Sequence, residues 1–159
     1  MQPEEIRHYL QRAIDLSREG MTSARGGPFG CVIVQDGVIV AEGYNRVTSD
    51  MDPTAHAEVV AIREACRRLG SFQLDGCTLF SSCEPCPMCL GAIYWARPEA
   101  VYYAGTRQDA AGAGFDDALI YEEIGRPGSS RSIPFTHVAM EGAVQVFEEW
   151  KRREGKQPY

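Results

Sequence analysis

Short apolar runs typical of β-strands alternate with amphipathic helical stretches along most of the chain. Helical repeats of apolar side chains occupy the segments near 3–20, 53–70, 115–124 and 143–150, and a further helix is expected near 85–95, where Pro85 suits a first turn. The strand-like runs are Phe29–Val34, Val38–Ala41, Cys77–Phe80, Ala100–Ala104 and, more weakly, Thr136–Met140. Strands that alternate with helices form a largely parallel sheet covered on both faces. The pattern therefore predicts an α/β fold, a three-layer α/β/α sandwich around a five-stranded mixed sheet.

Local sequence signals predict where some of these elements begin and where the chain turns between them. Asp36-Gly37 separates the first two strand-like runs and predicts a tight antiparallel hairpin. Asp52-Pro53 predicts the start of the second helix, because aspartate caps a helix and proline fits its first turn, and Pro85 predicts the start of the third. A length of 159 residues is that of one ordinary domain, so we expect a single domain over residues 1–159.

Charge and composition exclude several function classes. The formal net charge is -6 and the sequence pI is near 5.1, which disfavours a nucleic-acid partner. No apolar run approaches the roughly 20 residues of a membrane helix, and the N-terminal residues lack the pattern of a secretion signal. We therefore expect a cytoplasmic protein with no membrane partner. In that compartment six cysteines point to metal binding or catalysis rather than to disulfides.

The residues that carry chemistry gather at two expected helix starts. One is His56-Ala57-Glu58 and the other is Pro85-Cys86-Pro87-Met88-Cys89. Two cysteines three residues apart in a first helical turn lie on one face, and the free amides there favour their thiolates. With His56, Cys86 and Cys89 supply three ligands for one Zn²⁺ ion per subunit. The fourth tetrahedral position is then left to water or hydroxide, as in a catalytic rather than a structural zinc site.

Glu58 is the candidate proton carrier. It can converge with His56 only if the ion lies beyond the helix end, because residues two apart do not share a helix face. One alternative is a structural site in which Cys83 is a fourth ligand and Glu58 a surface carboxylate; a redox pair and an iron–sulfur site lack their usual context. The catalytic interpretation is favoured because His-x-Glu followed by Pro-Cys-x-x-Cys is the general signature of zinc deaminases.

At these residues the chain resembles the cytidine deaminase superfamily, and within it the small zinc-dependent guanine deaminases of bacteria. The resemblance runs nearly from end to end and is carried by Gly26–Gly30, Asp52–Glu58, Ser82–Pro98, Gly114–Asp117 and Lys156–Tyr159. It implies hydrolysis at the carbon that bears the exocyclic amine of guanine, giving xanthine and ammonia. Glu58 would act first as base and then as acid, since an amine leaves only once it is protonated.

The resemblance also implies the rest of the site. Asp117 would be a second catalytic acid, although a charge at a helix start is an equally ordinary role for it. The C-terminal segment, about residues 136–159, would be exchanged between the subunits of a homodimer and would close the pocket. The substrate-binding residues would be Asn45, Ala57, Phe29, Trp95 and Tyr159. A turn asparagine and core packing of the two aromatic residues are the structural alternatives.

Several rival functions share the same metal motif. A tRNA adenosine deaminase would need a basic face for RNA, which an acidic chain does not suggest. A guanosine or cytosine deaminase is compatible with the motif, because pocket shape rather than the metal sets the base. A non-catalytic, zinc-stabilised interaction module is the alternative from another class.

Overall fold

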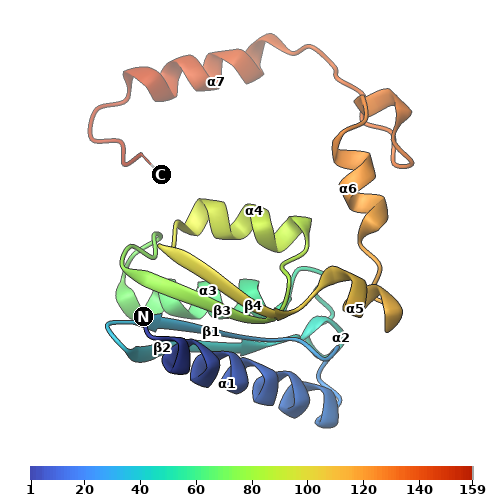
Figure 1. The fold of residues 1–159 in the computed structure, drawn as a ribbon. Helices are drawn as coiled ribbons and strands as arrows, with labels where there is room; N and C mark the ends of the chain where they lie inside the picture. Colours follow the sequence, from blue (N-terminus) through green and yellow to red (C-terminus); the bar gives the residue numbers. More distant parts are fainter. Residues whose placement is uncertain (159) are drawn as a thin grey trace. The chain divides into compact units, whose positions relative to one another are not determined.

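A computed structural model describes residues 1–158 and separates the chain into two compact units, Met1–Asp117 and the segment from Ala118 onward. The first unit contains a four-stranded sheet with the order β2-β1-β3-β4 (Figure 1). The strands are β1 (Gly30–Gln35), β2 (Val38–Tyr44), β3 (Cys77–Cys83) and β4 (Ala100–Gly105).

The sheet is mixed, as predicted, but it is not largely parallel. The hairpin at Asp36 and Gly37 makes β1 and β2 antiparallel, with both residues at positive φ, and β1 also pairs antiparallel with β3. Only β3 and β4 form a parallel pair in the described residues. The helical crossover after β2 makes β3 run in the same direction as β2 but places it next to β1. Because β1 and β2 are antiparallel, β1 and β3 are antiparallel as well.

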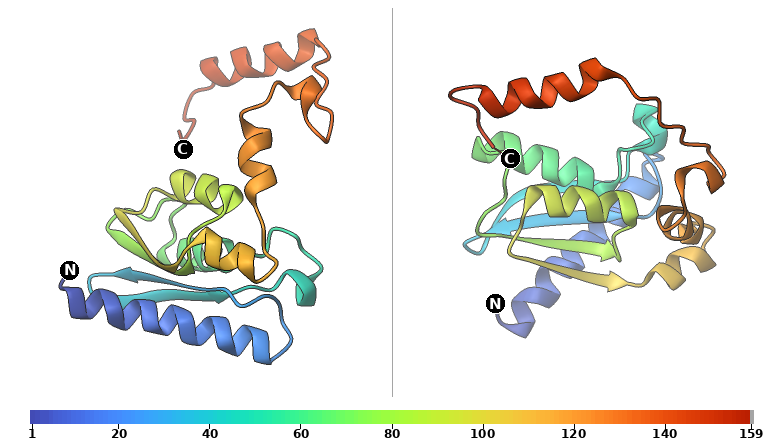
Figure 2. Two further views of the ribbon diagram at one scale, coloured as in Figure 1. Left: turned by 45° about the vertical axis from the view of Figure 1, so that its right-hand side comes forward. Right: turned by 90° about the horizontal axis from the view of Figure 1, so that it is seen from above.

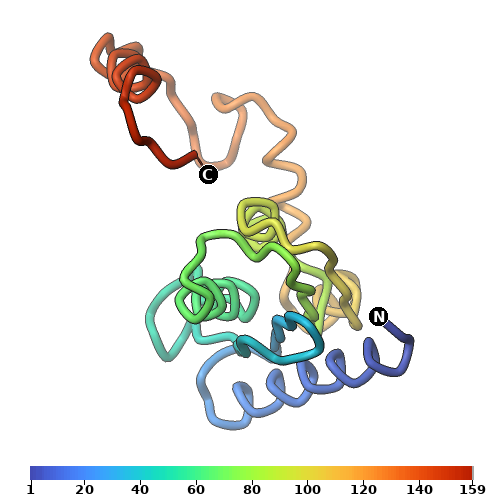
Figure 3. Tube along the Cα trace, turned by 90° about the vertical axis from the view of Figure 1, so that its left-hand side faces the viewer, coloured from blue at the N-terminus to red at the C-terminus, as the bar shows by residue number. Residues whose placement is uncertain are grey.

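Helices cover both faces of the sheet, which confirms the three-layer architecture. Strand β1 is buried from Gly30 to Val34 because its side chains point alternately into the hydrophobic cores on the two faces of the sheet. Val32 and Val34 pack with α1 (Pro3–Thr22), whereas Cys31 and Ile33 pack with α3 (Ala57–Leu69). Figures 2 and 3 show α1, in blue, on the face of the sheet opposite to α3 and α4.

The helix that carries the second cluster is α4 (Pro87–Ala96), whose Ile93 and Ala96 join the same core as α3. Two short helices, α2 (Val47–Asp50) and α5 (Arg107–Gly112), were not predicted. The expected helix start at Asp52-Pro53 is wrong. The Asp52 carboxylate accepts hydrogen bonds from the backbone and hydroxyl of Thr54, so it closes a turn, and α3 begins later, after His56.

Two glycines allow the helices to approach the sheet closely. A Cβ atom at Gly30 would lie 2.1 Å from the Ala13 carbonyl oxygen of α1. A Cβ atom at Gly43 would lie 2.5 Å from the Ala57 carbonyl oxygen at the start of α3. Gly43 therefore sets how near the first turn of α3 lies to strand β2.

The second unit contains α6 (Ala118–Ile124), the 3₁₀ turn η1 (Gly128–Ser130) and α7 (Glu141–Arg152). The loop after α6 is tied by hydrogen bonds from Ser132 to Glu123 and from Phe135 to Gly128. The fifth strand expected at Thr136–Met140 is absent, so the sheet has four strands. A strand needs a hydrogen-bonded neighbour, and the described residues of this unit contain none.

Within residues 1–158 no helix combines the length and the apolar character that crossing a membrane requires.

Candidate metal centre

The three predicted ligands meet where two helices begin. His56 is the N-cap of α3, Cys86 is the N-cap of α4, and Cys89 lies in the first turn of α4. Both N-cap residues have extended backbone, which turns their side chains away from the helix stem. The Cys86 and Cys89 sulfurs each lie 3.5 Å from His56 Nδ1, and the three ligand atoms all lie within 4.8 Å of one another.

These distances fit a tetrahedral zinc ion. With Zn–S bonds of about 2.3 Å and Zn–N bonds of about 2.05 Å, tetrahedral geometry places nitrogen and sulfur ligands about 3.6 Å apart. The observed sulfur–nitrogen separations agree with that value. Cys83 does not belong to the ligand cluster in the described residues, since its Sγ lies 3.5 Å from the carbonyl oxygen of Thr106. Three ligands leave a fourth position open, as a catalytic site requires.

The cluster holds its protons unevenly. Hydrogen bonding with Cys89, together with His56, lowers the pKa of the Cys86 thiol to about 4. The same contact with Cys86, together with burial, raises the pKa of Cys89. Cys86 also raises the pKa of His56. A divalent cation held between these two sulfurs would favour the thiolate form of both.

Glu58 lies directly beside the ligands, in the first turn of α3, and is only 6% exposed. Its Oε2 lies 3.4 Å from the Cys89 sulfur, and its Oε1 accepts a hydrogen bond of 3.1 Å from the Ser81 hydroxyl. Burial raises the pKa of the Glu58 carboxyl. A buried carboxyl of this kind can exchange a proton with a group bound at the metal centre.

Asn45 follows strand β2 and is 6% exposed. Its amide oxygen accepts hydrogen bonds from the backbone N–H groups of Gly27 and Val47, both at 3.2 Å. The amide oxygen thereby fixes the loop before β1. Because both bonds use the oxygen, the amide nitrogen is left as a donor without an acceptor in residues 1–158.

An aromatic contact ties the Asp117 segment to the same loop. Phe115 meets Phe29 edge to face, with ring centroids 4.9 Å apart, and its ring atoms would lie within 3.2 Å of a Cβ atom at Gly27. Asp117 follows two residues later. Burial raises the pKa of the Asp117 carboxyl, and the negative charge of Cys86 raises it further. Asp117 therefore interacts electrostatically with one of the predicted metal ligands.

The remaining predicted residues lie at varied places. Ala57 is fully buried and belongs to the first turn of α3, where backbone N–H groups have no partner inside the helix. Trp95 lies in the last turn of α4 and is 65% exposed, so the structure does not bring it into the ligand cluster. Tyr159 lies outside the described residues.

Sequence reasoning missed Ser81 and Phe115. Ser81 contacts Glu58, but it lies just beyond Cys77–Phe80, the strand-like run that the sequence predicts. Phe115 was predicted as part of an apolar helical repeat and of the Gly114–Asp117 stretch that carries the resemblance, but not as a contact of Phe29. A serine directly after Leu79 and Phe80, in strand phase with Leu79, was the signal that could have revealed Ser81.

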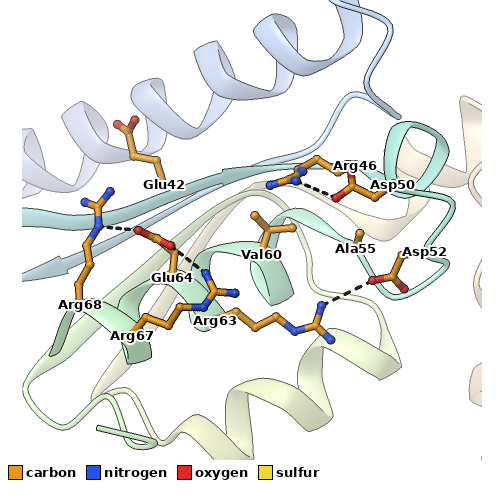
Figure 4. A pocket seen from close by; sticks show the side chains of 10 residues that line it. All are labelled: Glu42, Arg46, Asp50, Asp52, Ala55, Val60, Arg63, Glu64, Arg67 and Arg68. Atoms are coloured by element: carbon orange, nitrogen blue, oxygen red, sulfur yellow. Dashed lines mark hydrogen bonds and ion pairs between the residues drawn. The ribbon is translucent and has the colours of Figure 1, made fainter. Parts of the chain in front are cut away.

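A charged groove of about 330 Å³ lies elsewhere on the first unit, between β2, α2 and α3 (Figure 4). Its arginines are matched by acidic neighbours, with Arg46 paired to Asp50, Arg63 to Asp52, and Arg67 and Arg68 to Glu64. No ligand of the metal centre lines this groove. Because its charges are internally balanced, we do not place the chemistry there.

Comparison with known proteins first defines the class. Residues 3–105 match the family described as the cytidine and deoxycytidylate deaminase zinc-binding region. The chain belongs to this zinc-binding family, and His56, Cys86 and Cys89 are positioned as a possible site for the ion.

Individual relatives then narrow the comparison. The chain is 57% identical to guanine deaminase of Bacillus subtilis (strain 168), over 95% of this chain and 97% of that protein. The X-ray structure of guanine deaminase from Bacillus subtilis matches with a TM-score of 0.95 at 55% identity, covering 100% of this chain and 99% of that one. A tRNA-specific adenosine deaminase of Aquifex aeolicus (strain VF5) is 32% identical over 79% of this chain and 81% of its own length.

Proposed function

We propose that this protein is a zinc-dependent aminohydrolase that converts guanine and water into xanthine and ammonia. The observation that carries the proposal is the buried Glu58 carboxylate, 3.4 Å from one of three convergent zinc ligands. The choice of guanine is supported by 57% identity over nearly the full length to a guanine deaminase.

The chemistry divides between the metal and one carboxylate. Zinc held by His56, Cys86 and Cys89 would supply a water acidic enough to attack the ring carbon that bears the amine. Glu58 accepts a proton from the attacking water and passes it to the ring nitrogen, and then transfers the second proton of that water to the leaving nitrogen, so that xanthine and ammonia are released. Two thiolate ligands cancel the formal charge of the ion, which makes a nearby base more important. The burial of Glu58 keeps bulk water away from this proton transfer.

Asn45 is proposed to bind the base. The free donor of its amide suits an acceptor on the purine, and guanine offers two such acceptors, O6 and N7. The amide oxygen is already fixed by two backbone N–H groups, so the donor is held in one orientation. Adenine shares N7 but carries an amine at the position of O6, so a fixed donor placed at O6 would disfavour adenine.

Four other residues complete the proposed site. Asp117 would act as a second acid that shuttles protons at the polar edge of the base. The N–H of Ala57, in the first turn of α3, would donate to the substrate. Phe29 and Trp95 would form aromatic walls against the flat ring.

The C-terminal segment, about residues 136–159, is proposed to be exchanged between the subunits of a homodimer and to close the pocket with Tyr159. No residue of α6 or α7 that the structure describes is buried, and α7 exposes Val144, Phe147 and Trp150. Apolar side chains of an amphipathic helix need a surface to cover them. A partner subunit would provide one.

Deleting residues 156–159 tests the role of the tail in closing the pocket. We expect kcat/KM to fall by about 10-fold or more, because an open pocket admits water and loses a substrate contact. The urea midpoint of unfolding should change little, since terminal residues contribute little to a core. Unchanged turnover would contradict this role.

Mixed dimers test the exchange itself. The tail-deleted chain is expected to keep at most about a tenth of the activity and the Glu58→Gln chain almost none, but together they would form one complete site if the tail crosses to the partner. Recovery of activity on mixing supports the exchange. A mixture as inactive as its components, or a monomer by light scattering, would contradict it.

The partners we propose are small molecules, and the compartment is the cytoplasm. The net charge of -6 does not favour a polyanion, and all six cysteines are free thiols, as in a reducing compartment.

Product analysis tests the substrate assignment. Zinc-loaded protein would be incubated with guanine, guanosine, adenine and cytosine, and also with tRNA. We expect xanthine and ammonia in equal amounts from guanine, and kcat/KM values at least about 100-fold lower for the others. Turnover of another substrate in preference to guanine would overturn the assignment, and no turnover with retained zinc would favour the interaction module.

A further inference from the structure

Ser81 is a buried hydroxyl in an apolar strand. It is 2% exposed and follows Leu79 and Phe80 of β3, which are fully buried. Burying a hydroxyl without a hydrogen-bond partner costs free energy. The Ser81 hydroxyl has a partner, the Oε1 atom of Glu58 at 3.1 Å, and both residues are buried. The polar group in this strand is therefore matched to the carboxylate of the site.

The pleat of β3 explains why this position can reach Glu58. Alternate residues of a strand face the same side, so Ser81 faces the side of Leu79. Leu79 packs in the core shared by α3 and α4, whereas Phe80 packs in the core beneath α1. Ser81 thus lies beneath the first turn of α3, from which the Glu58 side chain projects.

The two carboxylate oxygens of Glu58 have different neighbours. Oε1 accepts from Ser81, and Oε2 lies on the side of the Cys89 sulfur. The last side-chain torsion of a glutamate is broad and roughly two-fold, so packing alone holds it weakly. A donor fixed on a buried strand restricts that torsion and keeps one oxygen directed toward the ligands.

We propose that Ser81 is a positioning residue that holds Glu58 Oε1 and thereby directs Oε2 at the metal centre for proton transfer. This inference rests on the proposed function, in which Glu58 carries the proton. Ser81 itself touches neither the substrate nor the metal. It acts through Glu58, so its loss should slow the chemical step more than it weakens substrate binding.

The test compares Ser81→Ala and Ser81→Thr with a matched control, Ser82→Ala. Ser82 neighbours Ser81 in the same strand, and its hydroxyl accepts a hydrogen bond of 2.9 Å from the Gly30 N–H instead of contacting Glu58. For Ser81→Ala we expect a fall in kcat of about 10- to 100-fold, the effect of one hydrogen bond to a charged group. KM for guanine should stay within about 3-fold, with one zinc per chain retained.

The two other variants separate positioning from general damage. Ser81→Thr keeps the hydroxyl and should recover most of kcat, while Ser82→Ala should keep kcat near that of the unchanged protein. Unchanged kcat in Ser81→Ala would overturn the proposal, and so would a loss of zinc or a change confined to KM. Equal impairment in Ser82→Ala would overturn it as well.

A second readout does not depend on the substrate. Crystal structures of the zinc-loaded protein and of Ser81→Ala should show the Glu58 carboxylate rotated or in two conformers in the variant, with the zinc ligands in place. An unmoved carboxylate would overturn the proposal even if guanine is turned over. A rotated carboxylate in a protein that does not convert guanine would support the role of Ser81 and reject the proposed substrate.

Discussion

His56 and Glu58 are two residues apart and nevertheless face one point. Within a helix such residues diverge, but His56 is the N-cap and has extended backbone, whereas Glu58 is helical. The ion site therefore lies beyond the N-terminal end of α3, which is the condition under which His56 and Glu58 can act at one ion. The same device operates at α4, where Cys86 is the N-cap and Cys89 is helical.

Asn45→Asp separates the two uses of the Asn45 amide. Aspartate keeps an oxygen that can accept from Gly27 and Val47, but it has no donor and carries a negative charge. We expect the urea midpoint to stay nearly unchanged while kcat/KM for guanine falls by about 100-fold or more, because a donor becomes a repelling charge. Steady-state kinetics with urea unfolding checks this. Equal activity would show that Asn45 only shapes the loop.

The sequence predicted the metal ligands and Glu58 because their spacing is local to two helix starts. It could not reveal Ser81 as the partner of Glu58, since these residues are 23 positions apart and meet only after α3 packs on the sheet. The contact between Phe115 and Phe29 is hidden for the same reason. Asn45 and Asp117 were found by resemblance, which spacing alone did not supply.

The packing of α3 on β2 depends on a glycine at the contact. For Gly43→Ala we expect a loss of about 1–3 kcal/mol in the free energy of unfolding, because the new Cβ would meet the backbone of Ala57 and Ala61. Displacing α3 should also lower the zinc content after dialysis. Urea unfolding and metal analysis measure both.

Gly91→Ala is the matched control, since nothing lies within 4 Å of its Cβ position and it lies inside α4. Alanine there should raise the free energy of unfolding by about 0.5–1 kcal/mol. If both variants were equally stable, the close approach at Gly43 would not matter.

An ion pair joins α1 to the edge strand β2. Arg12 donates two hydrogen bonds to the Glu42 carboxylate, at 2.7 and 2.9 Å, and this pairing lowers the pKa of Glu42 below its usual 4.5. A lowered pKa in the folded state stabilises the protein above about pH 4.5, and the stabilisation is lost as the pH falls through the folded-state pKa.

Glu42→Gln should therefore cost about 1 kcal/mol at pH 7, because the pair is partly exposed and screened. The difference from the unchanged protein should shrink at lower pH as the Glu42 carboxylate becomes protonated. Urea unfolding across this range measures it. A difference that does not vary with pH would contradict the ionic origin of the effect.

The hairpin and the three long helices of the first unit were predictable because each has a local signal. Asp36-Gly37 marks the turn, apolar residues at helical spacing mark α1 and α3, and a proline close to its start marks α4. The start of α3 was placed too early because a capping aspartate before proline also closes a turn. The six-residue α5 is too short to show a periodic apolar face.

The molecule as a whole combines a family domain with a C-terminal unit of helices. The family match ends at Gly105, whereas the similarity to guanine deaminase continues over 95% of the chain. The zinc centre lies within the matched family region, and Asp117 and the second unit lie beyond it. The order of the strands could not be predicted, because it depends on which side of the β1–β2 hairpin β3 pairs with, and no local sequence pattern specifies that.

The central claim is that Glu58 moves protons at a zinc centre built by His56, Cys86 and Cys89. The most direct test is the rate of xanthine release by Glu58→Gln protein that carries one zinc per chain. Glutamine keeps the size of the side chain but cannot accept a proton. The account predicts retained zinc and a loss of turnover of about a thousandfold or more. Turnover close to that of the unchanged protein, with zinc in place, would contradict it.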